Sequence, residues 1–170
     1  MDNRIATRRL VLRRMTMADV PALFAIMSDA ETMRYWSTLP HAAPDVTERF
    51  VAETMAAVAA GQADDFAITL NGAVIGKAGL WQGSELGVLL DRSHWGRGFA
   101  REALRAIIDR AFARHVQRLD ADVDPRNQAS LRLLGQLGFT KTGEAKATFQ
   151  LGKDWVDSVY LSLSAADYGT

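Results

Sequence analysis

A short segment with two glycines, His94-Trp95-Gly96-Arg97-Gly98-Phe99-Ala100, stands directly before a predicted helix. The first N–H groups of a helix have no partner within the helix, and they carry a partial positive charge. Glycine lets the backbone curl around an anion without side-chain clashes. The segment therefore predicts a cradle for a phosphate or pyrophosphate group. A tight turn that only leads into the helix is the alternative interpretation.

Two nucleotide-binding motifs combine a glycine turn with a helix, and neither fits this segment. The dinucleotide fingerprint needs three glycines as G-x-G-x-x-G, and Arg101 stands at the third position. The phosphate-loop motif needs Gly-Lys-Ser/Thr, which the segment lacks. A dinucleotide-dependent enzyme is therefore disfavoured.

The composition excludes other kinds of chemistry. The sequence has no cysteine, so disulfides, thiolate metal sites and a cysteine nucleophile are ruled out. The histidines His41, His94 and His115 lie far apart without metal-ligand spacing, so no metal is predicted. Twenty basic and 20 acidic residues balance, which gives no long-range attraction to nucleic acid or an anionic membrane.

The length and the distribution of apolar residues suggest one cytoplasmic domain. The 170 residues fit a single domain, 1–170, and contain no linker or repeat. No apolar run approaches the roughly 20 residues of a membrane span, and the N-terminus does not resemble a signal peptide.

The elements that must position the glycine segment follow from periodicity. Leu10 and Leu12 predict a first strand within Arg8 to Arg14. A helix should follow Asp19, with Pro21 in its first turn and an apolar stripe of Val20, Leu23, Phe24 and Met27. A second helix should open at Asp45 with Glu48 in a capping box, end at Gly61 and bury Val51, Met55 and Val58.

A hairpin and a third strand lead into the glycine segment. Asn71-Gly72 between 66–70 and 73–81 is a strong hairpin signal, because both residues tolerate positive φ. Residues 85–90 should form the next, antiparallel strand, in which Gly87 suggests a bulge or a close backbone approach.

The second half of the chain alternates helices and strands. The helix after the glycine segment has a wide apolar stripe, formed by Ala103, Leu104, Ile107, Ile108, Ala111 and Phe112. Residues 118–124 alternate strictly as a strand, and a helix over 128–137 should end at Gly138. Residues 139–142 and 156–163 predict the last strands, so the fold class is mixed α+β.

The glycine segment resembles the acyl-CoA signature of the GNAT superfamily of N-acetyltransferases, Gln/Arg-x-x-Gly-x-Gly/Ala. Trp95 stands at the Gln/Arg position, Gly98 at the glycine and Ala100 at the last position. With Glu102 after it, the segment is similar to the branch of ribosomal-protein N-terminal (alanine/serine) acetyltransferases. The branch's other motifs are matched in order by Thr7 to Arg13 with Asp19, Glu85-Leu86-Gly87, Asn127-Gln128-Ala129-Ser130 and Leu137-Gly138-Phe139.

Three positions depart from the family pattern. Arg92 replaces a proline that is common before the turn, and Val88 replaces a tyrosine that often follows Glu-Ile-Gly. Leu134 stands where many members have a tyrosine that acts as general acid. A tyrosine from that helix is therefore not available to this chain.

The resemblance implies a fold, a cosubstrate and a site. The fold would be a central mixed, mostly antiparallel sheet of about seven strands with helices on both faces. The cosubstrate would be acetyl-CoA, without a metal. Its binding residues would be Val88, Leu89, Leu90, Trp95, Gly96, Arg97, Gly98, Phe99, Ala100, Arg101, Asn127 and Ser130.

Transfer of an acetyl group to an amine needs a base, an oxyanion donor and a proton for the departing thiolate. Without cysteine, direct attack of the amine on the thioester is the simplest mechanism. Glu85 is the candidate base, with a solvated carboxylate at a strand start as the alternative; Asp91 and Glu31 are weaker candidates.

Three other site groups are expected from the same chemistry. Backbone N–H groups near Val88 to Leu90 would meet the oxyanion. Ser130 would donate to the thiolate, or else only cap its own helix. Asn127 would hold the pantetheine arm, or else only shape the turn after Pro125.

The amine acceptor is the least readable part of the sequence. Trp36 and Trp81, with Glu85, are the predicted acceptor residues, Trp155 is a further candidate, and a core or dimer face explains these tryptophans equally well. The predicted function is acetyl transfer from acetyl-CoA to a primary amine, a protein N-terminus or a small molecule, by a monomer or homodimer. A non-catalytic acyl-CoA sensor of the same fold is the alternative. Neither nucleic acid nor membrane is an expected partner.

Overall fold

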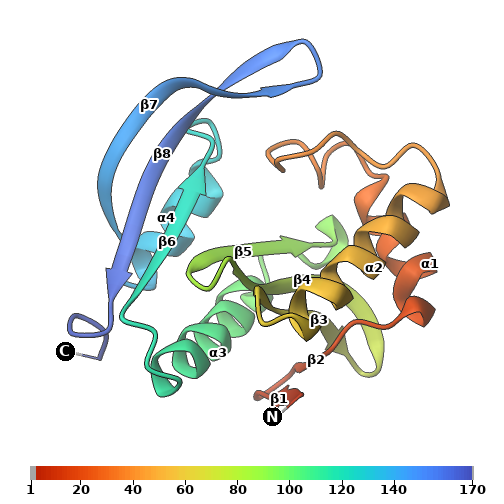
Figure 1. The fold of residues 1–170 in the computed structure, drawn as a ribbon, viewed down its shortest axis with the longest axis horizontal. Helices are drawn as coiled ribbons and strands as arrows, with labels where there is room; N and C mark the ends of the chain where they lie inside the picture. Colours follow the sequence, from red (N-terminus) through yellow and green to blue (C-terminus); the bar gives the residue numbers. More distant parts are fainter. Residues whose placement is uncertain (1–2, 170) are drawn as a thin grey trace.

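A computed structural model describes residues 3–169 of the chain and shows an eight-stranded sheet with helices on both faces (Figure 1). The strands are β1 Arg4–Ala6, β2 Val11–Arg13, β3 Ala63–Leu70, β4 Ala73–Trp81, β5 Glu85–Leu90, β6 Arg118–Val123, β7 Thr140–Leu151 and β8 Asp154–Ser164. The helices are α1 Val20–Met27, α2 Pro44–Ala59, α3 Phe99–Ala113 and α4 Gln128–Gln136.

The strands lie in the order β1-β2-β3-β4-β5-β6-β8-β7. Every neighbouring pair is antiparallel except β5 and β6, which are parallel because α3 connects them. The predicted mixed, mostly antiparallel sheet is confirmed. It has one strand more than expected, because the three-residue edge strand β1 carries no apolar alternation.

The two faces of the sheet have separate cores. Side chains from α3 and α4 pack on one face with Leu86 and Leu90 of β5. On the other face, Leu89 packs with Met27 and Met33 of the α1 region. Successive side chains of one strand thus serve opposite faces, as strand geometry requires. The predicted helices on both faces are confirmed.

The sheet opens between β5 and β6, which diverge after a single register pair, Glu85 with Asp120 (Figure 1). The Asp120 N–H donates to the carbonyl of Ser84 at 3.0 Å, so the Ser84 backbone faces β6. Backbone groups alternate in direction along a strand, so those of Leu86, Val88 and Leu90 face the same way. The register shows no further pairing of β5 with β6, and these groups border the gap.

The Asn71-Gly72 hairpin has the predicted conformation. Asn71 has φ 51° and Gly72 has φ 83°, as a two-residue turn of this kind requires. Gly87 forms no bulge, since the β4–β5 register is continuous. A Cβ at Gly87 would lie 3.8 Å from the ring of Trp36, an ordinary van der Waals distance to a side chain, so the close-approach alternative is wrong as well.

Two predictions about the second helix were wrong. The helix begins at Pro44 with Ala43 as its N-cap, and no side chain caps it, so Asp45 and Glu48 form no capping box. Proline suits the first helical position, because its missing N–H would have no partner there. Met55 is 38% exposed; the small residues Thr54 and Ala57 face the sheet instead.

The strand boundaries at both ends of the chain also differ from the prediction. The first predicted strand shrinks to β2, while β7 and β8 form a hairpin much longer than expected. Most of β7 is exposed, and its register shifts between Ala145 and Phe149. An exposed, irregular edge strand has no alternating apolar pattern by which a sequence reveals it. Within the described residues, no helix is long and apolar enough to cross a membrane.

Candidate active site

The glycine segment forms a left-handed turn at the start of α3. Gly96 has φ 70° and Gly98, the N-cap of α3, has φ 78°. The first helical hydrogen bond runs from the Glu102 N–H to the Gly98 carbonyl at 3.1 Å. Within residues 3–169, the N–H groups of 96–101 donate to no other residue. Six consecutive unpaired donors at a helix start are suited to an anion.

A cavity of about 580 Å³ extends from this turn to α4. A smaller cavity of about 100 Å³ continues it between β5 and β6. The two share Tyr35, Trp36, Val88, Asn127, Ser130 and Leu133. Of the predicted cofactor residues, all line the larger cavity except Arg97, whose guanidinium lies 4.9 Å from the centroid of the Phe99 ring. The fold thus brings together groups from β5, α3, α4 and the loop after α1.

Trp95 forms part of the wall beside β5. Its indole N–H donates to the Leu90 carbonyl at 2.8 Å, while the residue remains 48% exposed. That carbonyl borders the gap between β5 and β6. The hydrogen bond from Trp95 therefore satisfies one of the backbone groups that β6 leaves unpaired. Of the other two residues whose backbone borders the gap, Leu86 lines only the smaller cavity, while Val88 lines both.

The start of α4 supplies two polar side chains. The Ser130 N–H donates to Oδ1 of Asn127 at 3.2 Å, so Asn127 is the N-cap. The alternative in which Ser130 caps its own helix is therefore wrong. The Ser130 hydroxyl has no hydrogen bond to any other residue described and lines both cavities. It can donate to a ligand, and so can the Asn127 amide nitrogen.

Glu85 lies at the opposite end of β5 from the glycine turn and is not among the residues lining either cavity. The residue is exposed, but partial burial of the carboxyl raises its pKa, and the charges of Asp122 and Asp120 raise it further. A strand rises about 3.3 Å per residue, so about 10 Å separates Glu85 from Val88. At that backbone separation, a group bound at Val88 would exchange a proton with Glu85 through water.

The predicted acceptor tryptophans lie in different places. Trp36 lines both cavities and covers Lys77, whose ammonium lies 5.2 Å from the ring centroid. Trp81 ends β4 with 45% exposure, and Trp155 on β8 is 61% exposed; neither is among the lining residues. Trp36 alone of the three adjoins the cavities.

Sequence reasoning missed several lining residues. Thr32, Arg34 and Tyr35 come from the loop after α1, and His94 and Gln136 also line the wall. Glu31, one of the weaker candidate bases, lines the same cavity. The loop has no periodic pattern, so only its position in the fold reveals it. Within residues 3–169, no three His, Asp or Glu side chains are grouped as a metal site needs.

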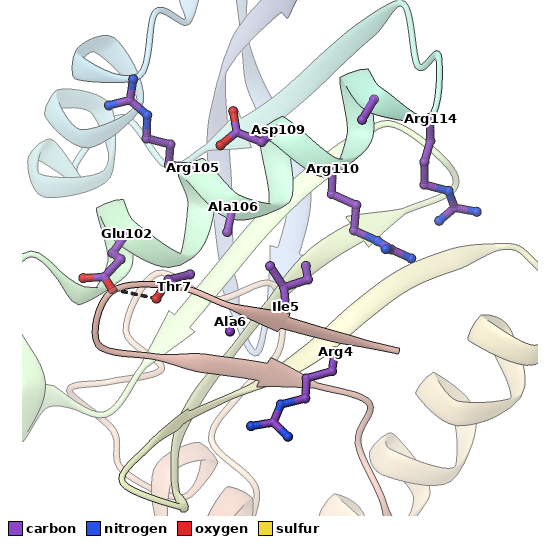
Figure 2. Close-up of a pocket in the computed structure, with 11 residues that line it drawn as sticks. Arg4, Ile5, Ala6, Thr7, Glu102, Arg105, Ala106, Asp109, Arg110 and Arg114 are labelled. Atoms are coloured by element: carbon purple, nitrogen blue, oxygen red, sulfur yellow. Dashed lines mark hydrogen bonds between the residues drawn. The ribbon is translucent and has the colours of Figure 1, made fainter. Parts of the chain in front are cut away.

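A further hollow lies elsewhere, between β1 and α3 (Figure 2). Its volume is about 750 Å³. Arg110 and Arg114 on its wall pair with Asp64, and Asp109 accepts from Tyr168 at 2.6 Å. These charges are already engaged within the protein, so the groove is a weaker ligand site than the cavity at the glycine turn.

Known proteins share both sequence and fold with this chain. Residues 9–140 match the Acetyltransferase (GNAT) domain family. The chain is 32% identical over 172 residues to the uncharacterized N-acetyltransferase p20 of Bacillus licheniformis, covering 95% of this chain and 96% of that protein. It is 36% identical over 85 residues to [ribosomal protein uS5]-alanine N-acetyltransferase of Escherichia coli (strain K12), covering 49% of this chain and 43% of that one.

A solved structure shows the same fold. Spermidine N-acetyltransferase from Vibrio cholerae, in complex with CoA and spermine, aligns with a TM-score of 0.83 at 19% identity, over 95% of this chain and 99% of that one. The domain match covers most of the sequence, and the relative p20 is matched over nearly its whole length. The chain belongs to the GNAT acetyltransferase family.

Proposed function

We propose that this protein transfers an acetyl group from acetyl-CoA to a primary amine by direct attack in a ternary complex. The observation that carries the proposal is the row of unpaired N–H groups at 96–101, which opens on a cavity of about 580 Å³. Backbone donors at a helix start favour an anion such as a pyrophosphate. The Vibrio cholerae structural neighbour, which holds CoA, supports the choice of cosubstrate.

The site residues suit the different parts of acetyl-CoA. Residues 96–101 would bind the pyrophosphate, and Asn127 would donate to the pantetheine arm along the gap between β5 and β6. The Val88 N–H would donate to the thioester carbonyl and to the oxyanion that forms on attack. Such a donor is effective because it is already oriented before the reaction.

The reaction then requires two proton transfers. The acceptor ammonium loses a proton through water to Glu85, and the neutral amine attacks the thioester carbon. The C–N bond forms and the C–S bond breaks. The departing thiolate accepts a hydrogen bond from Ser130 and takes up the proton that the attacking nitrogen releases as it becomes an amide. Since the chain has no cysteine, no cysteine acyl-enzyme takes part.

The acceptor is proposed as a class, primary amines. The Escherichia coli relative acts on an alanine of a ribosomal protein, and the Vibrio cholerae neighbour was crystallised with spermine. Protein N-termini and small amines are both compatible with the cavity beside Trp36 and Tyr35. We propose that a single domain, 1–170, performs the whole reaction.

Two measurements test this function. The first follows acetyl-CoA consumption with three acceptor classes: N-terminal peptides, aminoglycosides or polyamines, and amino acids. The second measures CoA binding by calorimetry. Turnover with one class supports the enzyme, while tight CoA binding without turnover in any class favours an acyl-CoA sensor. Absence of CoA binding would refute both.

A further inference from the structure

The N-terminal segment is fastened to the first turn of α3 through one carboxylate. Glu102 accepts from the Thr7 hydroxyl at 2.6 Å, from the Arg9 N–H at 2.7 Å and from Arg9 Nε at 2.6 Å. Figure 2 shows the Thr7 contact at the end of the groove between β1 and α3. The carboxylate is largely buried, at 16% side-chain exposure. Arg9 is thereby fixed beside the glycine turn.

Arg9 also holds the turn itself. Its Nη1 donates to the Arg97 carbonyl at 2.9 Å, and its guanidinium lies 4.4 Å from the centroid of the Phe99 ring. A Cβ at Gly98 would lie 3.3 Å from Nη2. One guanidinium therefore connects the carboxylate of Glu102, the aromatic ring and the peptide between Arg97 and Gly98.

The direction of that peptide decides what the turn offers to an anion. In a trans peptide the carbonyl and the following N–H point in opposite directions. Because Arg9 binds the Arg97 carbonyl, the Gly98 N–H points away from Arg9, and Gly98 lines the cavity. If the peptide turned over, its carbonyl would replace a donor. Such a flip rotates ψ of Arg97 and φ of Gly98, and glycine at 98 makes the rotation easier, so the direction needs a lock.

The charge of Glu102 gives a second reason why the turn needs Arg9. Glu102 lies in the first turn of α3, beside the proposed anion site. An uncompensated carboxylate there would repel a pyrophosphate. The ion pair with Arg9 neutralises this charge without removing the hydrogen bonds of Glu102.

We propose that Arg9 is a positioning residue for the cosubstrate. It fixes the Arg97–Gly98 peptide with its N–H toward the pyrophosphate and neutralises Glu102. This inference rests on the proposed use of acetyl-CoA. It adds a residue from the N-terminal segment that acts through the turn and does not touch the reacting atoms.

Calorimetry with CoA tests the proposal on Arg9→Ala. We expect CoA binding at least about 10-fold weaker, because a hydrogen bond to a charged group and a charge compensation are lost together. With acetyl-CoA as substrate, KM should rise while kcat at saturation changes little. Arg8→Ala is the matched control, since Arg8 loses the same charge one residue away and is exposed without a hydrogen bond or ion pair to the described residues.

A substrate without the diphosphate separates positioning from a general structural role. With acetyl-pantetheine, Arg9→Ala should match the wild-type kcat/KM, because no anion lies on the turn. Arg9→Lys should recover only part of the CoA affinity, since one ammonium cannot bridge both partners as the guanidinium does. If Arg9→Ala does not fold, Arg9→Lys replaces it in these measurements, and the melting temperature of Arg9→Lys shows whether its fold is intact.

Unchanged CoA affinity in Arg9→Ala and Arg9→Lys would overturn the proposal, as would equal losses with CoA and acetyl-pantetheine. Failure of the wild-type protein to bind CoA would be a different result. It would overturn the proposed function, and this inference with it.

Discussion

At the scale of single residues, the raised pKa of Glu85 bears on its proposed role as the base. Partial burial raises the pKa of its carboxyl, and Asp122 and Asp120 raise it further. A base must be deprotonated to act, so activity should rise with pH through this elevated pKa. In the proposed mechanism, a water bridges Glu85 and the group bound at Val88.

We expect Glu85→Gln to lower kcat by about 100-fold, the low end of the range for general bases, with little change in CoA affinity. The pH–rate profile of the variant should lose the ionisation seen in the wild type. Measurement of kcat between pH 5 and 9 checks both points. Full activity of Glu85→Gln at every pH would show that another group or bulk water is the base.

The same pKa has a consequence for stability, which serves as an independent control. The folded-state pKa is raised, so the stabilising contribution is present below the unfolded pKa and is lost as pH rises through the folded one. Glu85→Gln should therefore melt slightly higher than the wild type at pH 7. Below the usual carboxyl pKa, that gain should disappear. Thermal melts at both pH values give the comparison.

Asn127 caps α4, which leaves the Ser130 hydroxyl available for its proposed role at the leaving thiolate. A single hydrogen bond contributes about 0.5–1.5 kcal/mol, so Ser130→Ala should lower kcat by roughly 2- to 15-fold without abolishing it. Ser130→Thr retains a hydroxyl and should keep more activity than the alanine variant. Mass spectrometry of the enzyme with acetyl-CoA and no acceptor should find no acetyl group on Ser130. An acetyl-Ser130 that transfers onward at the catalytic rate would require a covalent mechanism instead.

At the scale of elements, the turn before α3 depends on a conformation that few residues adopt. Gly98 has φ 78°, and a side chain there would approach Arg9 Nη2. A β-branched residue is strained at positive φ and would also displace the guanidinium. The turn, more than the helix behind it, is therefore the sensitive part of this element.

We expect Gly98→Val to abolish CoA binding in calorimetry while the circular dichroism spectrum stays native. Gly135→Ala is the control: Gly135 lies in α4 with no atom within 4 Å of its added Cβ, and alanine favours a helix. Native CoA affinity in Gly98→Val would exclude the turn as the pyrophosphate site.

At the scale of the whole molecule, CoA should stabilise one cooperative unit. The cavity draws on β5, α3, α4 and the loop after α1, so separation of these elements would break the site. At 100 times its Kd, a ligand adds about 2.7 kcal/mol, which for a domain of this size raises Tm by about 5–10 °C. Differential scanning calorimetry should show a single transition that moves as a whole. Two transitions, only one of them sensitive to CoA, would contradict a single domain.

The sequence by itself determined the features that depend on local order. The hairpin at Asn71-Gly72, the stripe of α3 and the turn at Gly96 and Gly98 each follow from residues within one or two turns of chain. The family motifs likewise lie in short runs. Local steric rules suffice for such features, because the interacting residues are neighbours in sequence.

Tertiary structure decided what depends on distant partners. The edge strand β1, the length of β7 and the burial of Thr54 in place of Met55 have no local signal. The divergence of β5 from β6 opens the cavity, and the loop at Tyr35 closes one side of it. The contact of Arg9 with Glu102 joins positions 93 residues apart. Such pairings depend on how the sheet brings separate segments together, which no short pattern in the sequence encodes.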